Sequence, residues 1–119
     1  MIREAIDKPE GDIYASDLYG IKLLNADMSS IKDITGLERC INLENLSLSN
    51  NQITDVSSLS GLTNLMNLDL SSNQITDVSP LSGLANLICM DLRSNQIPDA
   101  STLRISGPRI IIFIQQSGS

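Results

Sequence analysis

A period of 22 residues runs through most of this 119-residue chain. Residues 46–67, LSLSNNQITDVSSLSGLTNLMN, and residues 68–89, LDLSSNQITDVSPLSGLANLIC, align without a gap. Residues 24–45 form a weaker copy ahead of them, and residues 90–99 begin a further copy behind them. Self-similarity at such a period is typical of a solenoid, in which each repeat contacts only its neighbours. We therefore expect one coil per copy, stacked into a single elongated core.

Each copy opens on an LxL motif, such as Leu68-Asp69-Leu70. Alternate residues of a β-strand point to opposite faces, so the two leucines are expected to face inward and the residue between them outward. Since one copy cannot bury its leucines alone, neighbouring copies should pair as parallel strands about 4.8 Å apart. The return segment should reach the same core through tight turns or short 3₁₀ pieces. In the second copy its apolar residues are Ile53, Val56, Leu59, Leu62 and Leu65.

One column of asparagines, Asn51, Asn73 and Asn95, invites a functional interpretation, but an architectural one is favoured. Where a strand turns sharply inward, backbone N–H and C=O groups become buried and need partners. An asparagine amide both donates and accepts hydrogen bonds. We therefore expect each side chain to serve backbone groups of its own coil and of the adjacent coil.

A column of aspartates follows at the same period. Because four stacked carboxylates would repel one another, a ladder of bound cations is disfavoured, and each carboxylate is expected to cap the turn after it. For Asp55 the donors would be the N–H groups of Ser57 and Ser58. The members of this column are Asp33, Asp55, Asp77 and Asp99.

The motif LxxLxLxxNxI at this period resembles the leucine-rich repeat, and the wording NQITDVSPLSGLANL resembles its bacterial internalin-type subclass. The lead-in REAIDKPEGDIYASDLYGIKLLNA is similar to the N-terminal cap of such repeats in secreted bacterial proteins. The resemblance implies an α/β repeat solenoid, a right-handed superhelix with a parallel β-sheet on its concave face and short 3₁₀ or loop segments on its convex face. The expected parts are a cap at residues 1–23, repeats at residues 24–99 and a degenerate C-terminal repeat at residues 100–119, with a final strand at about 110–114.

The outward strand positions form the surface on which a solenoid usually binds partners. Asp69 and Asp91 are expected on adjacent strands, where like charges repel, with Arg93 near enough to offset them. The face lacks the aromatic and arginine anchors that dominate interface energetics, so either binding here is weak and polar or the chain is a scaffold without a partner. The candidate partner-binding residues on this concave face are Asn45, Ser47, Ser49, Asn67, Asp69, Ser71, Cys89, Asp91 and Arg93.

The C-terminal repeat carries a different prediction. Adding one period to Met90 gives Ile112, which places Ile111 and Phe113 on the outward face of a last strand. A terminal strand with unpaired backbone groups and exposed apolar side chains is a sticky edge. We therefore predict that Ile111 and Phe113 mark an edge through which the protein forms homo-oligomers. The two cysteines occupy different columns, Cys40 inward and Cys89 outward, so a disulfide between them is not expected.

Composition narrows the function. The chain contains no His, which excludes imidazole catalysis and His-ligated zinc, and its net charge of −6 is unfavourable for nucleic acid. No signal peptide and no apolar run long enough to insert into a membrane is present in these residues, while the resembled family is secreted or attached to the cell surface. The prediction is a non-enzymatic module for protein binding, such as cell adhesion, without cofactor or metal; the alternative is a structural spacer or truncated scaffold fragment without a specific ligand.

Overall fold

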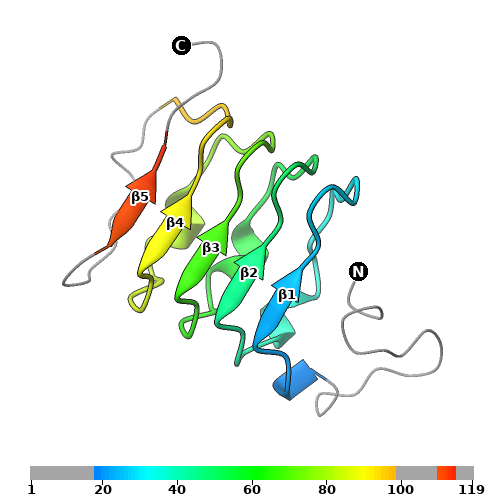
Figure 1. Ribbon diagram of the computed structural model, residues 1–119, viewed down its shortest axis with the longest axis vertical. Helices are drawn as coiled ribbons and strands as arrows, with labels where there is room; N and C mark the ends of the chain where they lie inside the picture. The colour runs from blue at the N-terminus through cyan, green and yellow to red at the C-terminus, as the bar shows by residue number, and fades with distance from the viewer. Residues whose placement is uncertain (1–17, 99–109, 115–119) are drawn as a thin grey trace.

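The computed structural model describes residues 18–98 and 110–114, and these residues form a parallel β-sheet of five short strands (Figure 1). The strands follow one another across the sheet in chain order, from β1 to β5. Leu46 of β2 pairs with Leu68 of β3, which in turn pairs with Met90 of β4, so each step across the sheet equals one repeat. The strands are β1 Leu23–Asn25, β2 Asn45–Ser47, β3 Asn67–Asp69, β4 Cys89–Asp91 and β5 Ile111–Phe113.

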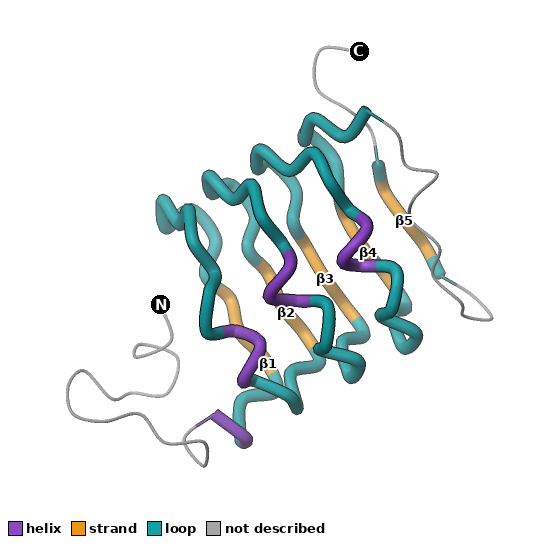
Figure 2. The backbone as a smooth tube through the Cα atoms, turned by 180° about the vertical axis from the view of Figure 1, so that it is seen from behind, coloured by secondary structure: helices purple, strands orange, loops and turns teal. Residues whose placement is uncertain are grey.

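Short 3₁₀ helices lie on the return segments, in front of the sheet in the view of Figure 2. They are η1 Leu37–Arg39, η2 Ser57–Leu59 and η3 Ser79–Leu81. A 3₁₀ turn suits these segments because it is compact and places one apolar residue per turn toward the core. Leu37, Leu59 and Leu81 are those residues, and each is fully buried. The predicted solenoid of strands and 3₁₀ turns is confirmed.

The core is a stack of aliphatic side chains between the sheet and the return segments. Leu46, Leu68 and Met90 occupy equivalent strand positions and are all buried, as predicted from the LxL motif. The return segment of the second repeat contributes its predicted residues as well, with none more than 1% exposed. Removing a buried leucine side chain from such a stack typically costs about 2–5 kcal/mol. The fully described core of this repeat comprises Leu46, Leu48, Ile53, Val56, Leu59, Leu62 and Leu65.

The asparagine column does what the sequence predicted. The amide nitrogen of Asn73 donates to the carbonyl of Leu48 in the preceding repeat at 2.9 Å and to that of Leu70 in its own repeat at 3.0 Å. The amide oxygen of Asn73 accepts from the N–H of Ile53 at 3.1 Å. Asn95 repeats this pattern one coil further on, and its side chain is completely buried. The column therefore joins adjacent coils through otherwise unpaired backbone groups.

The aspartate column follows the prediction only in part. Asp55 accepts from the N–H of Ser57 at 2.9 Å, but no hydrogen bond from Ser58 accompanies it, and Val56 rather than Asp55 is the N-cap of η2. Because the carboxylate lies one residue ahead of the cap, it reaches the N–H two residues on and closes a local turn. Asp33 and Asp77 make the same contact, with Thr35 and Ser79, whereas Asp99 lies outside the described residues.

A second asparagine column was missed at the sequence level. Asn42, Asn64 and Asn86 recur at the repeat period, and each donates its amide to the backbone carbonyl of the residue 23 positions before it. The Asn64 side chain, for instance, donates to the carbonyl of Ile41 at 2.9 Å. The signal was the NL dipeptide that ends each return segment. These exposed hydrogen bonds connect neighbouring turns at the point where each turn leads into its strand.

The turns after β1 to β4 contain a residue with a left-handed backbone. Asn50, Ser72 and Ser94 have φ of 58°, 56° and 60°, and Met28 occupies the equivalent place in the first repeat with φ 52°. Asparagine tolerates this conformation better than most residues, while an ordinary side chain is strained there. These inward turns therefore adopt a backbone conformation that costs free energy locally, and the packing of the coils compensates for it.

The predicted N-terminal cap lies mostly outside the described residues, which begin with the helical Leu18 and Tyr19. In the part of the chain that is described, no helix is long and apolar enough to cross a membrane. The same residues contain no group of three or more acidic or cysteine side chains arranged to hold a metal ion.

Candidate interaction surface

The outward side chains of the five strands, together with the residues that follow β1 to β4, form one continuous surface, which we call the concave face. It faces the viewer in Figure 1. Its rows run across the strands, because the parallel register places equivalent residues side by side. The concave face comprises Leu23, Asn25, Asp27, Asn45, Ser47, Ser49, Asn67, Asp69, Ser71, Cys89, Asp91, Arg93, Ile111 and Phe113.

One predicted surface residue is largely withdrawn from solvent. Ser49 is only 8% exposed. Its N–H donates to Asp27 Oδ1 at 2.8 Å, and the Ser47 hydroxyl donates to the same oxygen at 2.7 Å. The carboxylate of Asp27, in the first repeat, thus lies over the backbone at Ser49, in the second repeat. The prediction that Ser49 is exposed is therefore wrong, and it offers little to a partner.

The first row of the surface carries an amide pair. The Asn67 side chain donates its Nδ2 to Asn45 Oδ1 at 2.6 Å. Asn45 is half-buried and Asn67 is exposed, so the remaining Nδ2 of Asn45 and Oδ1 of Asn67 stand at the surface. The pair thus presents one donor and one acceptor in a fixed orientation.

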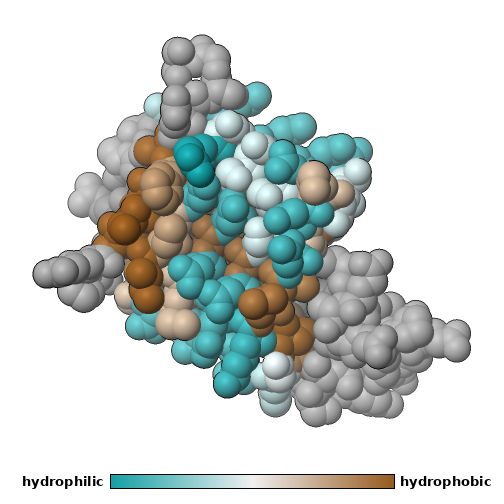
Figure 3. Space-filling view, in the orientation of Figure 1, coloured by the Kyte–Doolittle hydropathy of each residue, from teal (hydrophilic) through white to brown (hydrophobic). Residues whose placement is uncertain are grey.

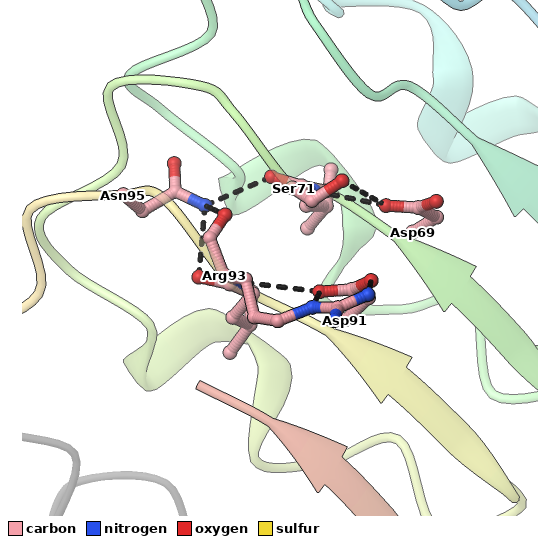
Figure 4. Close-up of polar contacts among 7 residues, drawn as sticks. Asp69, Ser71, Asp91, Arg93 and Asn95 are labelled. Atoms are coloured by element: carbon pink, nitrogen blue, oxygen red, sulfur yellow. Dashed lines mark hydrogen bonds and ion pairs between the residues drawn. The ribbon is translucent and has the colours of Figure 1, made fainter. Parts of the chain in front are cut away.

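Asp69 lies at the centre of the surface, on β3. Its Oδ1 accepts from both the N–H of Ser71, at 3.0 Å, and the hydroxyl of Ser71, at 2.7 Å (Figure 4). Both bonds come from two residues further along the same chain segment, so the carboxylate is oriented locally. Its second oxygen has no hydrogen-bond partner among the described residues.

Asp91 occupies the equivalent place on β4 and is neutralised by Arg93. Arg93 Nε lies 3.0 Å from Asp91 Oδ1, and Nη2 lies 2.6 Å from Oδ2, which makes a bidentate ion pair (Figure 4). The hydrogen bond from the Arg93 side chain lowers the pKa of Asp91, and the carboxylate raises the pKa of Arg93. Arg93 therefore lies near the two aspartates as predicted, with Asp91 as its direct partner, and the offset of a repulsion between Asp69 and Asp91 stays a prediction.

Phe113 adds an aromatic residue that the sequence analysis assigned only to the edge of the sheet. Its position on β5 lies beside Asp91, with which it is in register, and the guanidinium of Arg93 lies 5.0 Å from its ring centroid. This distance falls within the range of a cation–π contact. The surface therefore contains one aromatic–arginine anchor; the repeat period placed Phe113 on the outward face, and the structure adds its contact with Arg93.

A groove of about 300 Å³ crosses the surface from β1 to β5. Its lining combines apolar groups at both ends with amides and carboxylates between them. Residues that line it include Leu23, Asn45, Asn67, Asp69, Cys89 and Phe113. Of the predicted partner-binding residues, the groove is lined by Asn45, Ser47, Asn67, Asp69, Cys89 and Asp91, whereas Ser49, Ser71 and Arg93 do not line it.

The cysteines behave as expected. Cys40 is buried and Cys89 is partly exposed on the concave face, and both are free. Burial raises the pKa of the Cys40 thiol, which keeps it protonated and unreactive. Their different environments follow from their different columns in the repeat.

The predicted self-association edge is β5, the last strand of the described sheet. Ile111 is 58% exposed and Phe113 is 41% exposed. Both side chains point to the concave face, since Ile111 pairs with Cys89 and Phe113 with Asp91. Association of copies of the chain through this edge stays a prediction.

Comparisons with known proteins agree with this geometry. A family model described as "Leucine Rich repeats (2 copies)" matches residues 41–83. Among solved structures, an internalin (inlF) from Listeria monocytogenes is similar to this chain with a TM-score of 0.82 and 38% sequence identity, over 85% of this chain and 30% of that chain. An internalin C2 (inlC2) from the same organism has a TM-score of 0.48 and 28% identity, over 86% of this chain and 66% of that chain. No curated protein matches. The chain thus spans less than a third of the inlF structure.

Proposed function

We propose that this chain, a leucine-rich repeat protein with repeats of the internalin type, is a non-enzymatic module that binds another protein through its concave face. The observation that carries the proposal is the groove, a recess that crosses all five strands of the described sheet and combines apolar and polar walls. Recognition surfaces commonly combine apolar and polar groups in this way. The chain spans only part of its relative, so the activity of a longer protein is not implied.

The fixed orientation of the side chains supports the proposal. Asp27, Asp69 and Asp91 are each held by hydrogen bonds, and the amides of Asn45 and Asn67 are paired with each other. A surface whose polar groups are already ordered loses less conformational freedom on binding. The strands beneath cannot shift independently, since each is hydrogen-bonded to its neighbours. The concave face is thus pre-organised for a partner.

Catalysis is not part of the proposal. A pair of carboxylates acting as acid and base needs two groups that titrate separately around a substrate. Asp91 is tied to Arg93 with both of its oxygens, and hydrogen bonding lowers its pKa, so it is a poor proton donor at neutral pH. The sequence contains no His to act as an alternative base.

Capture of protein partners with a matched pair of triple variants tests the proposal. The first variant combines Asp69→Ala, Asp91→Ala and Arg93→Ala on the concave face. The second combines Asp55→Ala, Asp77→Ala and Arg39→Ala on the return segments, which removes the same number and kind of charges. Circular dichroism checks that both variants fold.

A specific partner should be retained by the second variant and lost by the first. If both variants retain it, or both lose it while folded, the concave face is not the binding surface. If the wild-type chain captures no protein from extracts of its native cells or of a host, the alternative that it is a structural spacer is favoured instead.

A further inference from the structure

We propose that two copies of this chain join through β5, with the two strands antiparallel and centred on Ile112, so that their sheets become one continuous sheet. The inference goes beyond the proposed function and does not depend on it. It names the partner of the β5 edge, the direction of the two strands and the residues that face each other. The support comes from the backbone groups of β5, the end of the hydrophobic core and the apolar side chains on both faces of this strand.

The backbone groups of β5 divide between two sides. The N–H of Ile111 donates to the carbonyl of Ile88 at 2.9 Å, and the carbonyl of Phe113 also accepts a hydrogen bond from the β4 side. Consecutive residues of a strand direct their N–H and C=O groups to opposite sides, so the alternate residues of this segment direct theirs away from β4. In the part of the chain that the structure describes, no strand lies on that side. The residues concerned are Ile110, Ile112 and Ile114.

The hydrophobic core is less covered at β5 than at the other strands. Ile112 continues the inward column of Leu68 and Met90, which are at most 3% exposed, yet it is only partly buried against the core. At the opposite end of the sheet, Leu24 of β1 is 6% exposed. The core beyond β1 is therefore already covered and has little apolar surface to offer to β5 of another copy. A second β5 does have such surface, and the end of a solenoid core is stabilised when it is covered.

The outward residues of β5 differ in kind from those of the other strands. Ile111 is 58% exposed and Phe113 is 41% exposed, and Figure 3 shows hydrophobic atoms over this strand. Each of β1 to β4 carries at least one asparagine, serine or aspartate on this face. A strand that is apolar on both faces pairs best with another of the same kind, because an opposing polar side chain would lose water without gaining a partner. Among the strands of the described sheet, only β5 itself meets this requirement, so the partner is a second copy.

The direction and the register follow from symmetry and from the backbone groups. Two copies that use the same surface are related by a two-fold axis, and such an axis between two paired strands makes them antiparallel. An axis at Ile112 pairs this residue with its own counterpart and pairs Ile110 with Ile114 of the second copy. Both are hydrogen-bonded pairs, and together they use every N–H and C=O group between residues 110 and 114 that points away from β4. Moving the axis along the strand leaves some of these groups unpaired within the segment.

The same axis places Ile111 of one copy opposite Phe113 of the other on the concave face. Residues at such a position, between hydrogen-bonded pairs, have Cα atoms about 4.5 Å apart, so the two apolar side chains cover each other. Charges stay apart, because the row that contains Asp91 and Phe113 continues into Ile111 and Cys89 of the second copy. Phe113 also lines the groove. The grooves of the two copies therefore meet at the interface.

Cross-linking of single cysteine variants tests the inference. All are made in a Cys89→Ser background, because Cys89 lies beside Ile111 and would compete for a disulfide, whereas Cys40 is buried. One variant carries Ile111→Cys. The other carries Phe113→Cys and a larger cysteine-free tag, so that mixed and like-with-like products differ in mass on a non-reducing gel. Asn67→Cys, exposed on β3, is the control for random collision.

The mixture of the two variants should give about tenfold more cross-linked product than either variant alone, because residues 111 and 113 of different copies lie within disulfide distance. Identical positions of the two copies are about 8 Å apart at Cα in this register, which is too far for a disulfide. The second contact across the axis keeps its wild-type residues in the mixed dimer, so the interface persists. Asn67→Cys should give no product above the background with either variant.

Like-with-like products that equal or exceed the mixed product would overturn the inference, since they require another register or direction. The absence of any cross-link would overturn it as well, and light scattering of the Cys89→Ser parent would then show whether the chain is a monomer or associates through another surface. Both results leave the proposed function standing, because that function is tested by the capture of a different protein.

The mixed cross-link, in turn, supports the dimer whether or not such a protein is captured.

Discussion

The guanidinium of Arg93 lies over the ring of Phe113, 5.0 Å from the ring centroid, while it holds Asp91 with two hydrogen bonds. One side chain thereby connects the turn after β4 with β5. A double-mutant cycle of Arg93→Ala and Phe113→Ala should give a coupling free energy of about 0.5–1 kcal/mol, as expected of a partly exposed cation–π contact. Urea denaturation of the four proteins measures it. Additive effects of the two substitutions would show that the contact does not stabilise the fold.

Asn73→Ala should strongly destabilise the protein. The substitution leaves the N–H of Ile53 without its partner in the core, and an unpaired buried group costs about 1–3 kcal/mol. It also removes one of two asparagine donors from the carbonyls of Leu48 and Leu70, which keep Asn51 and Asn95, and each lost hydrogen bond costs about 0.5–1.5 kcal/mol. We expect a loss of about 2–4 kcal/mol in the free energy of unfolding. Asn67→Ala, at an exposed asparagine on β3, should cost less than about 0.5 kcal/mol. Similar losses at both positions would contradict the architectural role of the asparagine column.

Substitutions at Ser94 test the left-handed turn. Ser94 is exposed and has φ 60°, so a β-branched residue there should be strained. Ser94→Val is expected to lower the free energy of unfolding by about 1–2 kcal/mol, whereas Ser94→Asn should preserve or slightly raise it. Ser60→Val is the control, because Ser60 is exposed with φ −62°. Urea denaturation that finds equal losses for the two valine variants would argue against strain at Ser94.

Acid should destabilise the protein partly through the aspartate column. Hydrogen bonds from Ser57 and Ser79 lower the pKa of Asp55 and Asp77 in the folded state. In the unfolded chain the carboxyl pKa is about 3.9, so the unfolded state takes up protons first as the pH falls. The contribution of these two groups to the free energy of unfolding is therefore present above that pH and is lost as the pH falls below it. The double variant Asp55→Asn/Asp77→Asn keeps side-chain acceptors but cannot titrate. Its stability should fall less steeply than that of the wild type between pH 5 and 3 in urea denaturation at a series of pH values; parallel curves would refute the assignment.

Self-association through β5 is the remaining prediction. The exposed Ile111 and Phe113 make this strand the apolar edge of the described sheet, and unpaired strand edges favour pairing between chains. Light scattering should show a mass above that of the monomer at high concentration, and Phe113→Lys should shift the species toward monomer. Asn67→Lys, at an exposed position in the middle of the sheet, should leave the mass unchanged. A wild-type chain that stays monomeric throughout would exclude the edge as an interface.

Much of the fold could be predicted from the repeat period. Because equivalent residues recur at a constant interval and strand side chains alternate, Leu46, Leu68 and Met90 had to share one inward column, and Asn73 had to meet the preceding coil. The same reasoning placed Asp69 beside Asp91 and Cys89 on the outward face. These relationships depend only on backbone periodicity, which any uninterrupted repeat expresses directly in its sequence.

The tertiary structure alone decided how neighbouring side chains on the concave face share their contacts. Asp27 binds the backbone of Ser49, which is buried. Arg93 contacts Asp91 and Phe113 rather than Asp69. These contacts depend on side-chain rotamers and on distances between side chains of neighbouring repeats. They occur at positions where the residue differs from one repeat to the next. The repeat therefore determined which residues line the concave face, whereas packing between repeats determined which of them remain free for a partner.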